Sequence, residues 1–299
     1  MKQRNFITSP TLWLKISLGT IIVSIAIIIF IKPMWGIDFV GGSLLEIQGP
    51  QEGAVAAREI LQQEFSISAT TQATQDGSII IRTQSLNQET YDAILPRLQE
   101  DEREFFGDVL RFETIGPTIG QELRQKTVIA VGVVIIAMIA YLAYTFRQTK
   151  GRIAPWKFGV AAAYALAHDL ILVAAVYVLF GKFWGAEIDT LFVTAQLAIL
   201  GYSVNDTIVL FDRFVKEQKE HRNESLISVV NKATASTLGR SLNTSLTTLL
   251  ALGAILIFGG STIRWFVAAL AAGTITGAYS SIFVAPPMLW WLNRKHGRK

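Results

Sequence analysis

Residues 200–210, Leu-Gly-Tyr-Ser-Val-Asn-Asp-Thr-Ile-Val-Leu, place the carboxylate of Asp206 within an otherwise apolar helical run. A charged side chain at the centre of a bilayer costs about 2.5–3.5 kcal/mol even on the most lenient insertion scale, so such residues are rare and face the interior of a helix bundle. Proton and ion transfer are their usual roles. We therefore interpret this stretch as part of a membrane-spanning bundle that uses a transmembrane gradient.

The composition of the whole chain agrees with a protein that crosses a membrane several times. Hydrophobic residues make up 51% of the 299 residues, and charged residues only 17%. The chain contains no cysteine, which excludes disulfides, thiolate metal sites and a cysteine nucleophile. The formal net charge is +4, but the basic residues flank the apolar runs, where signals of membrane topology belong. We expect the lipid bilayer as a partner and no nucleic acid.

Six segments are long and apolar enough to cross a bilayer core of about 30 Å, which needs roughly 20 helical residues. They are residues 12–31, 127–146, 158–180, 190–211, 241–263 and 265–292. The first follows basic residues, as in a signal peptide, but no Ala-x-Ala cleavage site comes after it, so we expect an uncleaved anchor. Pro286 and Pro287 should break or kink the last helix near its end.

The orientation follows from the basic residues of the short loops. They gather after the second span, between the fourth and fifth spans and in the C-terminal tail, whereas the opposite loops offer only Lys182 and Arg264. Basic loops stay in the cytoplasm, so we expect both termini inside, in the inner (plasma) membrane. The predicted parts are a cytoplasmic N-terminus (1–11), a first transmembrane helix (12–32), an extracytoplasmic domain (33–122), a five-helix bundle (123–292) with a cytoplasmic loop (212–239), and a basic cytoplasmic tail (293–299).

The region between the first two spans is acidic and has its own structural pattern. Residues 33–120 contain no Lys and five Arg against fourteen acidic residues, without the spacing of a metal-binding loop, so we expect a solvated surface and no metal. The pattern predicts strands at 43–48, 67–73, 78–83 and 109–115, helices at 51–65 and 87–104 with Asn87 as the N-cap, and a turn at 75–77. This βαββαβ order predicts a small α+β, ferredoxin-like domain, a fold that by itself identifies no function.

Polar residues inside the third and fourth spans are the first candidate site residues. The third span contains His168 and Asp169, a pair that suits either a proton relay or a hydrogen-bonded anchor between helices. In the fourth span, Asn205 precedes Asp206. Tyr202 and Ser203 lie one helical turn before Asp206, so we expect them to help satisfy its carboxylate.

The fifth span opens with a second polar group. Asn243 and Thr244 follow Arg240 by three and four residues, which places all three on one helical face. This stripe would pair well with Asp206, and we expect an Asp206–Arg240 ion pair that forms and breaks as the acid loses and gains a proton. Alternatively, Arg240 is an ordinary flanking cation whose long side chain reaches the membrane surface.

A glycine-rich segment, Gly36-Ile-Asp-Phe-Val-Gly-Gly42, follows the first span. Gly36, Gly41 and Gly42 surround Asp38 in a turn that needs a positive φ. The segment lacks the strand-to-helix setting of a phosphate loop, so we expect no nucleotide. The chain also contains no nucleophile elbow, metal-ligand motif or Walker sequence, so we expect neither an enzyme nor a cofactor.

Several of these motifs occur together in one known family. They are Trp35-Gly-Ile-Asp-Phe-Val-Gly-Gly-Ser43, Ala167-His-Asp169, Gly201-Tyr-Ser-Val-Asn-Asp-Thr-Ile-Val-Leu-Phe-Asp-Arg213 and Arg240-Ser-Leu-Asn-Thr-Ser-Leu-Thr-Thr-Leu249. With them, the chain resembles SecF of the SecD/SecF family, bacterial protein-export membrane proteins related to the resistance-nodulation-division transporters. The resemblance covers nearly the whole chain: one span, an outer domain and five further spans.

The resemblance implies a function and a set of partners. Members of the family pair with SecD, and proton flow drives outer domains that help to pull preproteins from the SecYEG channel. Asp206 and Arg240 fall on the proton-pathway positions of the family. The resemblance therefore implies a proton-motive-force-coupled accessory subunit of the Sec translocase. The alternatives are a small-molecule exporter of the same superfamily, which would need two large outer domains, and a structural assembly factor that uses no energy.

Overall fold

The computed structural model describes residues 7, 9–74, 77–100, 105–147 and 153–294. The chain forms two compact units. The helical unit comprises Met1–Pro33, Ala130–Ala186 and Leu191–Lys299. The sheet unit comprises Met34–Ile129 and the short segment Glu187–Thr190. The sequence pattern assigns residues 187–189 only to a loop between two spans, and Thr190 to the start of the fourth span.

Within the described residues, six helical runs are long and apolar enough to cross a membrane. They are α1 (Pro10–Ile31), α5 (Pro117–Thr145), α6 (Pro155–Trp184), α7 (Thr190–Glu220), α8 (Leu226–Phe258), and a run formed by α9 (Ser261–Phe283) and α10 (Ala285–Asn293). The predicted break in the last run is confirmed, because α9 ends before the two prolines and they lie in the first turn of α10. Proline is tolerated there because the first N–H groups of a helix have no intrahelical acceptor.

Residues 212–239, which we expected to form a cytoplasmic loop between two spans, are largely helical. Helix α7 continues to Glu220, and α8 begins at Leu226. Ion pairs between residues one helical turn apart support the extension of α7. The Arg213 guanidinium lies 2.6 Å from a Glu217 carboxylate oxygen, and the Lys216 ammonium lies 2.7 Å from an Asp212 carboxylate oxygen. Such pairs stabilise exposed helices, and a search for apolar runs does not detect them. Helix α5 likewise begins ten residues before the predicted span.

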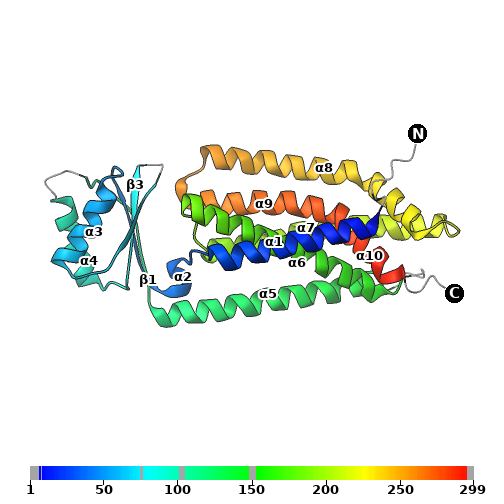
Figure 1. The fold of residues 1–299 in the computed structure, drawn as a ribbon, viewed down its shortest axis with the longest axis horizontal. Coiled ribbons are helices and arrows are strands. Elements are labelled where there is room, and N and C mark those ends of the chain that lie inside the picture. Colours follow the sequence, from blue (N-terminus) through cyan, green and yellow to red (C-terminus); the bar gives the residue numbers. More distant parts are fainter. Residues whose placement is uncertain (1–6, 8, 75–76, 101–104, 148–152, 295–299) are drawn as a thin grey trace. The chain divides into compact units, whose positions relative to one another are not determined.

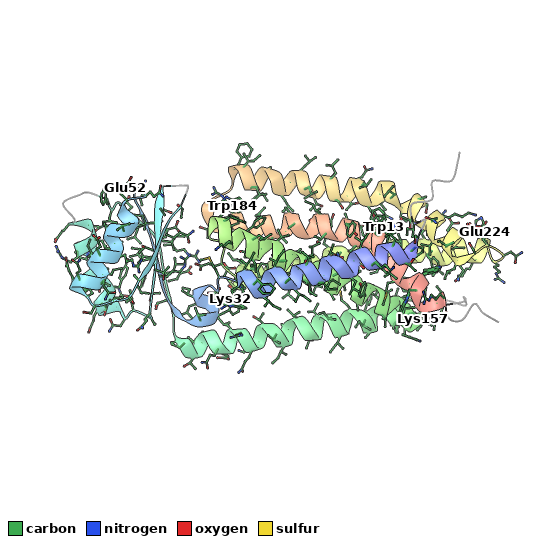
Figure 2. All side chains as sticks on the ribbon, in the orientation of Figure 1. Trp13, Lys32, Glu52, Lys157, Trp184 and Glu224 are labelled. Carbon is green, nitrogen blue, oxygen red and sulfur yellow. The ribbon has the colours of Figure 1, made fainter. Side chains whose placement is uncertain are left out.

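Close packing in the helical unit relies on small and aromatic residues. A Cβ added to Gly273 of α9 would lie 2.2 Å from Ile199 of α7, and one added to Gly277 would lie 3.1 Å from Ser203. Glycine therefore lets α9 approach α7 closely, in agreement with its four-residue spacing. On α1, the ring of Trp13 packs 4.2 Å from the ring of Phe283, centroid to centroid (Figure 2).

The sheet unit follows the order strand–helix–strand–strand–helix–strand. Its elements are β1 (Gly42–Gln48), α3 (Gly53–Glu64), β2 (Thr70–Ala73), β3 (Ser78–Thr83), α4 (Gln88–Gln99) and β4 (Val109–Ile115). The strands lie in the order β2-β3-β1-β4, with every neighbouring pair antiparallel. Figure 1 shows α3 and α4 on the same side of the sheet. Asn87 caps α4 as predicted, accepting from the Thr90 N–H at 2.8 Å.

Two predicted features of the sheet unit extend beyond the described residues. Gln75 and Asp76 of the predicted turn lie outside them, and Gly77 has a φ of 76°. The predicted helix at 87–104 ends at Gln99, and residues 101–104 also lie outside the described part.

The two faces of the sheet differ in polarity. The face toward the helices carries the buried side chains Ile47, Ile79 and Ile81. On the other face, Arg82 of β3 lies opposite Leu44 of β1. Side chains alternate between the faces of a strand, so the register also assigns charged residues to this face: they are Glu46, Arg111 and Glu113.

The glycine-rich segment forms one helical turn, α2 (Ile37–Val40), followed by two glycines of positive φ. Gly41 has a φ of 75° and Gly42 a φ of 129°, which confirms the predicted need for glycine. A Cβ on Gly42 would lie 2.6 Å from the carbonyl oxygen of Thr83. Gly42, the first residue of β1, therefore lies too close to β3 to carry a side chain.

Candidate functional site

Asp206 lies on the buried side of α7, with 7% of its surface exposed. The Ser241 hydroxyl of α8 lies near its carboxylate, and the charge of Arg240 acts on it electrostatically. Its Oδ2 atom is buried and has no hydrogen-bond partner among the described residues. A buried, unpaired polar atom costs about 1–3 kcal/mol, so this oxygen is open to a proton or to another donor.

The expected ion pair between Asp206 and Arg240 is not a direct contact. Among the described residues, no nitrogen of Arg240 lies within 4.0 Å of an Asp206 oxygen. Arg240 is exposed, whereas the next residue, Ser241, is buried against α7. Sequence analysis missed Ser241, although its position beside Arg240 at the start of a polar stripe was a usable signal.

The residues expected to support Asp206 face elsewhere. Ser203 donates to Asp169 at 2.7 Å, and the Tyr202 hydroxyl lies 3.4 Å from that of Ser245. Asn205 and Asn243 are exposed, and Thr244 is half-buried. Residues three positions apart on a helix differ in direction by about 60°. Therefore Ser203 and Asp206 can meet different neighbours.

A second polar cluster, the His168–Asp169 cluster, is fully buried in the helical unit. Asp169 Oδ2 accepts from the hydroxyls of Ser203 on α7 and Ser280 on α9, at 2.7 and 2.6 Å. Its Oδ1 lies 3.1 Å from Nδ1 of His168, and Nε2 of His168 lies 3.0 Å from the Thr20 hydroxyl on α1. Both ring nitrogens and both carboxylate oxygens are thus engaged, and the cluster joins α1, α6, α7 and α9.

The ends of the helical unit contain further polar contacts. The Lys157 ammonium, which is buried, donates to the Asn293 side chain at 2.9 Å (Figure 2). Near the end of α7, ligand atoms of Glu217, Glu220 and His221 lie within 4.8 Å of one another. Glu217 already pairs with Arg213 and His221, so ion pairing accounts for this group without a metal.

The glycine-rich segment brings Asp38 to the start of α7. Asp38 Oδ2 accepts hydrogen bonds from both the backbone N–H and the hydroxyl of Thr190, each at 2.7 Å. Gly36 lies beside it, and a Cβ there would approach the Asp189 Cβ to 3.2 Å. Asp38 therefore binds a segment about 150 residues later in the sequence, which sequence patterns did not predict.

Comparison with known proteins places these features in a family. The family profile described as "Protein export membrane protein SecD/SecF, C-terminal" matches residues 99–295. Protein translocase subunit SecF of Thermobaculum terrenum is 36% identical over 273 residues, which cover 87% of this chain and 84% of the relative. The same subunit of Synechocystis is 34% identical over 266 residues, 86% of this chain and 82% of the relative.

Two solved structures have the same fold. One is SecDF of Thermus thermophilus, described as a translocon-associated membrane protein, with 32% identity and a TM-score of 0.84 over 98% of this chain. The other is SecDF in a super-membrane-facing form, with 32% identity and a TM-score of 0.70 over all of this chain. This chain spans 39% and 40% of the respective SecDF chains.

Proposed function

The chain belongs to the SecD/SecF family of protein export membrane proteins, and on this premise we propose that it is an accessory subunit of the Sec preprotein translocase that uses the proton-motive force. Its place in the membrane is supported by six long apolar helical runs. The observation that carries the energetic part is Asp206, a buried carboxylate on a membrane-spanning helix, one oxygen of which has no hydrogen-bond partner in the part of the chain that the structure describes.

The proposed mechanism is alternating protonation of Asp206. Ionised, the carboxylate attracts Arg240 and can accept from Ser241; neutral, it loses the Coulomb attraction. Because Arg240 makes no ion pair with Asp206 within the described residues, its charge acts on the carboxylate through space. Helices then repack between discrete arrangements. The membrane potential supplies about 2.3 kcal/mol per charge per 100 mV.

The saturated His168–Asp169 cluster supports a different role for those residues. With every polar atom of the pair engaged, a proton relay through them would first have to break hydrogen bonds. We assign them to anchoring α1, α7 and α9 on α6. The saturated hydrogen bonds favour the anchoring role over the proton relay, the two roles that the sequence left open.

A SecD partner is favoured by polar residues exposed on the spans. Asn205, Arg240 and Asn243 are exposed on α7 and α8, and polar groups at membrane depth are covered by protein, not lipid. The similar SecDF chain is much longer, since this chain spans 39% of it. We propose that SecD covers this face and that the complex then acts on the SecYEG channel and its preprotein.

The proposed topology places both termini in the cytoplasm. The sheet unit, which we assign to the ferredoxin-like fold from its strand order β2-β3-β1-β4, then lies outside with its acidic surface. The proposed orientation in the membrane rests on the distribution of basic residues in the short loops.

The test is Asp206→Asn, which keeps the shape of the side chain but cannot ionise. Asp212→Asn is the matched control, because Asp212 lies on the same helix, exposed and paired with Lys216. Preprotein translocation would be measured in vesicles with an imposed proton gradient, together with the abundance of the complex. We expect Asp206→Asn to lose gradient-driven stimulation and Asp212→Asn to keep it. Parental translocation by Asp206→Asn, with its gradient dependence intact, would instead support a structural assembly factor.

A further inference from the structure

The connection between α6 and α7 belongs structurally to the sheet unit. Only four residues, Glu187–Thr190, enter this unit between two membrane-spanning helices. Helix α7 begins at the last of them, Thr190, and runs without a proline to Glu220. The start of the helix that carries Asp206 is therefore part of the sheet unit.

Two backbone hydrogen bonds hold this segment to the glycine-rich segment. The Ile188 N–H donates to the Met34 carbonyl at 2.7 Å, and the Gly36 N–H donates to the Ile188 carbonyl at 2.9 Å. Together they form a short parallel bridge between Trp35 and Ile188. The bridge fixes the register of the two segments.

Asp38 caps the N-terminus of α7, although it belongs to a distant part of the chain. The first N–H groups of a helix have no intrahelical acceptor, and a carboxylate at this end also interacts favourably with the helix dipole. The first turn of α7 contains no acidic residue. Asp38 supplies the acceptor, binding both donors of Thr190 at 2.7 Å.

An ion pair on the polar face of the sheet adds a third contact. Arg82 of β3 pairs with Glu187, and their side chains are only 14% and 12% exposed. Burial lowers the pKa of Arg82 to about 10, so its guanidinium stays charged at neutral pH. The charge of Asp189 also acts on Arg111, whose pKa is raised chiefly by its hydrogen bonds to Glu113. One acid of the segment thus pairs with an arginine of the sheet, and a second acts on another arginine through its charge.

We propose that Asp38, with the Arg82–Glu187 pair, is a positioning residue that transmits movement of α7 to the sheet unit. We name these contacts the α7 junction, formed by residues 34–38, 82 and 187–190. The inference rests on the proposed function. Asp206 lies about 24 Å along α7 from Thr190, at 1.5 Å per residue. A continuous helix carries a shift at Asp206 to its own start, where the junction passes it to the sheet unit.

The first test removes the cap. Asp38→Ala abolishes the acceptor, whereas Asp38→Asn keeps a carbonyl oxygen that can accept from Thr190. Asp92→Ala is the matched control, because Asp92 is an exposed acid on α4 bonded to Gln88. We expect Asp38→Ala to lose at least half of the gradient-driven stimulation of translocation, while Asp38→Asn and Asp92→Ala keep it. Complex abundance and gradient-independent export should stay at parental levels in all three, which a purely structural defect would not allow.

The second test replaces the cap with a covalent bond. A Cβ at Gly36 would lie 3.2 Å from the Asp189 Cβ, a few tenths of an ångström below the 3.5–4.5 Å range of disulfides. The chain has no native cysteine, so a Gly36→Cys/Asp189→Cys pair can be oxidised selectively. Placed in the Asp38→Ala background, this pair should restore gradient-driven stimulation when oxidised and lose it again with reductant. The two single-cysteine variants, treated with the same oxidant, are the controls.

The outcomes separate this inference from the proposed function. If Asp206→Asn loses stimulation but Asp38→Ala translocates like the parent, the junction inference is overturned and the proposed function stands. A disulfide that forms but fails to restore stimulation also overturns it. If Asp206→Asn keeps full gradient dependence, the proposed function falls and the inference falls with it. The junction inference is supported if Asp38→Ala loses gradient-driven stimulation, Asp38→Asn keeps it, and the oxidised cysteine pair restores it in the Asp38→Ala background.

Discussion

Ser203 of α7 donates a 2.7 Å hydrogen bond to Asp169 of α6, although it lies only one helical turn before Asp206. Asp169 and Asp206, two buried aspartates of the helical unit, therefore have opposite surroundings. Asp169 accepts two hydroxyls and lies against His168, whereas Asp206 keeps an oxygen without a partner among the described residues. The first arrangement favours rigid packing, and the second favours a change of protonation.

Removing either of the two serine hydroxyls that donate to Asp169 should lower the stability of the helical unit without affecting its response to a proton gradient. Hydrogen bonds between membrane helices contribute on average about 0.6 kcal/mol and at most about 1.7 kcal/mol. We expect Ser203→Ala and Ser280→Ala each to lower stability within that range, measured by thermal unfolding in detergent. Ser281→Ala is the control, because within the described residues its hydroxyl bonds only to the Ala278 carbonyl of its own helix. An equal loss in the control would contradict the anchoring role.

Arg240 should be replaceable by another cation. Because no Arg240 nitrogen lies within 4.0 Å of Asp206 among the described residues, the guanidinium contributes charge and not a two-bond contact. Lysine differs from arginine mainly in lacking that planar fork. We expect Arg240→Lys to keep most of the gradient-driven translocation and Arg240→Gln to lose it, in the vesicle assay. Equal loss in both variants would instead indicate a direct contact formed during the cycle.

Gly42 should tolerate no side chain. Its φ of 129° disfavours other residues, and an added Cβ would lie 2.6 Å from the Thr83 carbonyl oxygen. We expect Gly42→Ala to destabilise the protein by at least about 2 kcal/mol, combining backbone strain with a steric clash. Gly77→Ala separates the two causes, since Gly77 has a φ of 76° and nothing within 4 Å of the added Cβ. Gly77→Ala should lower the free energy of unfolding by about 1–2 kcal/mol, measured by denaturation followed with circular dichroism.

The orientation in the membrane can be measured with single cysteines in this cysteine-free chain. Glu52 and Asn223 are both exposed and belong to regions expected on opposite sides. In intact cells, an impermeant maleimide should label Glu52→Cys, and Asn223→Cys should be labelled only after the membrane is opened. The reverse pattern would show that the orientation based on basic loops is wrong.

Acid should weaken one contact of the sheet unit, between α3 and α4. Hydrogen bonds from Arg97 lower the pKa of Glu64. A folded pKa below the unfolded value of about 4.3 means that the folded state binds fewer protons. The pair therefore stabilises the fold above that pH, and its contribution is lost as the pH falls through the folded pKa. Arg97→Gln should lower the stability of the fold slightly at neutral pH, since an exposed pair contributes little. The difference from the parent should vanish as the pH falls through the folded pKa of Glu64, as measured by denaturation followed with circular dichroism at each pH.

Much of the architecture follows from local properties of the sequence. Long apolar runs predict the spans, because a backbone without water must satisfy its hydrogen bonds within a helix. Alternating residues and Asn87 likewise predict the elements of the sheet unit, since side-chain period and capping act over a few residues. The helical extension of α7 beyond the apolar run depends on ion pairs that a count of apolar residues does not register.

The sequence by itself determined that Asp206 is an acid within an apolar helix and that the glycine-rich segment needs a positive φ. Only the tertiary structure decided which partners these segments meet. It turned Ser203 toward Asp169, placed Ser241 against Asp206 and brought Asp38 to Thr190. The reason is physical: residue type and periodicity set a side chain's local conformation, whereas contacts between distant segments depend on how whole helices rotate and pack.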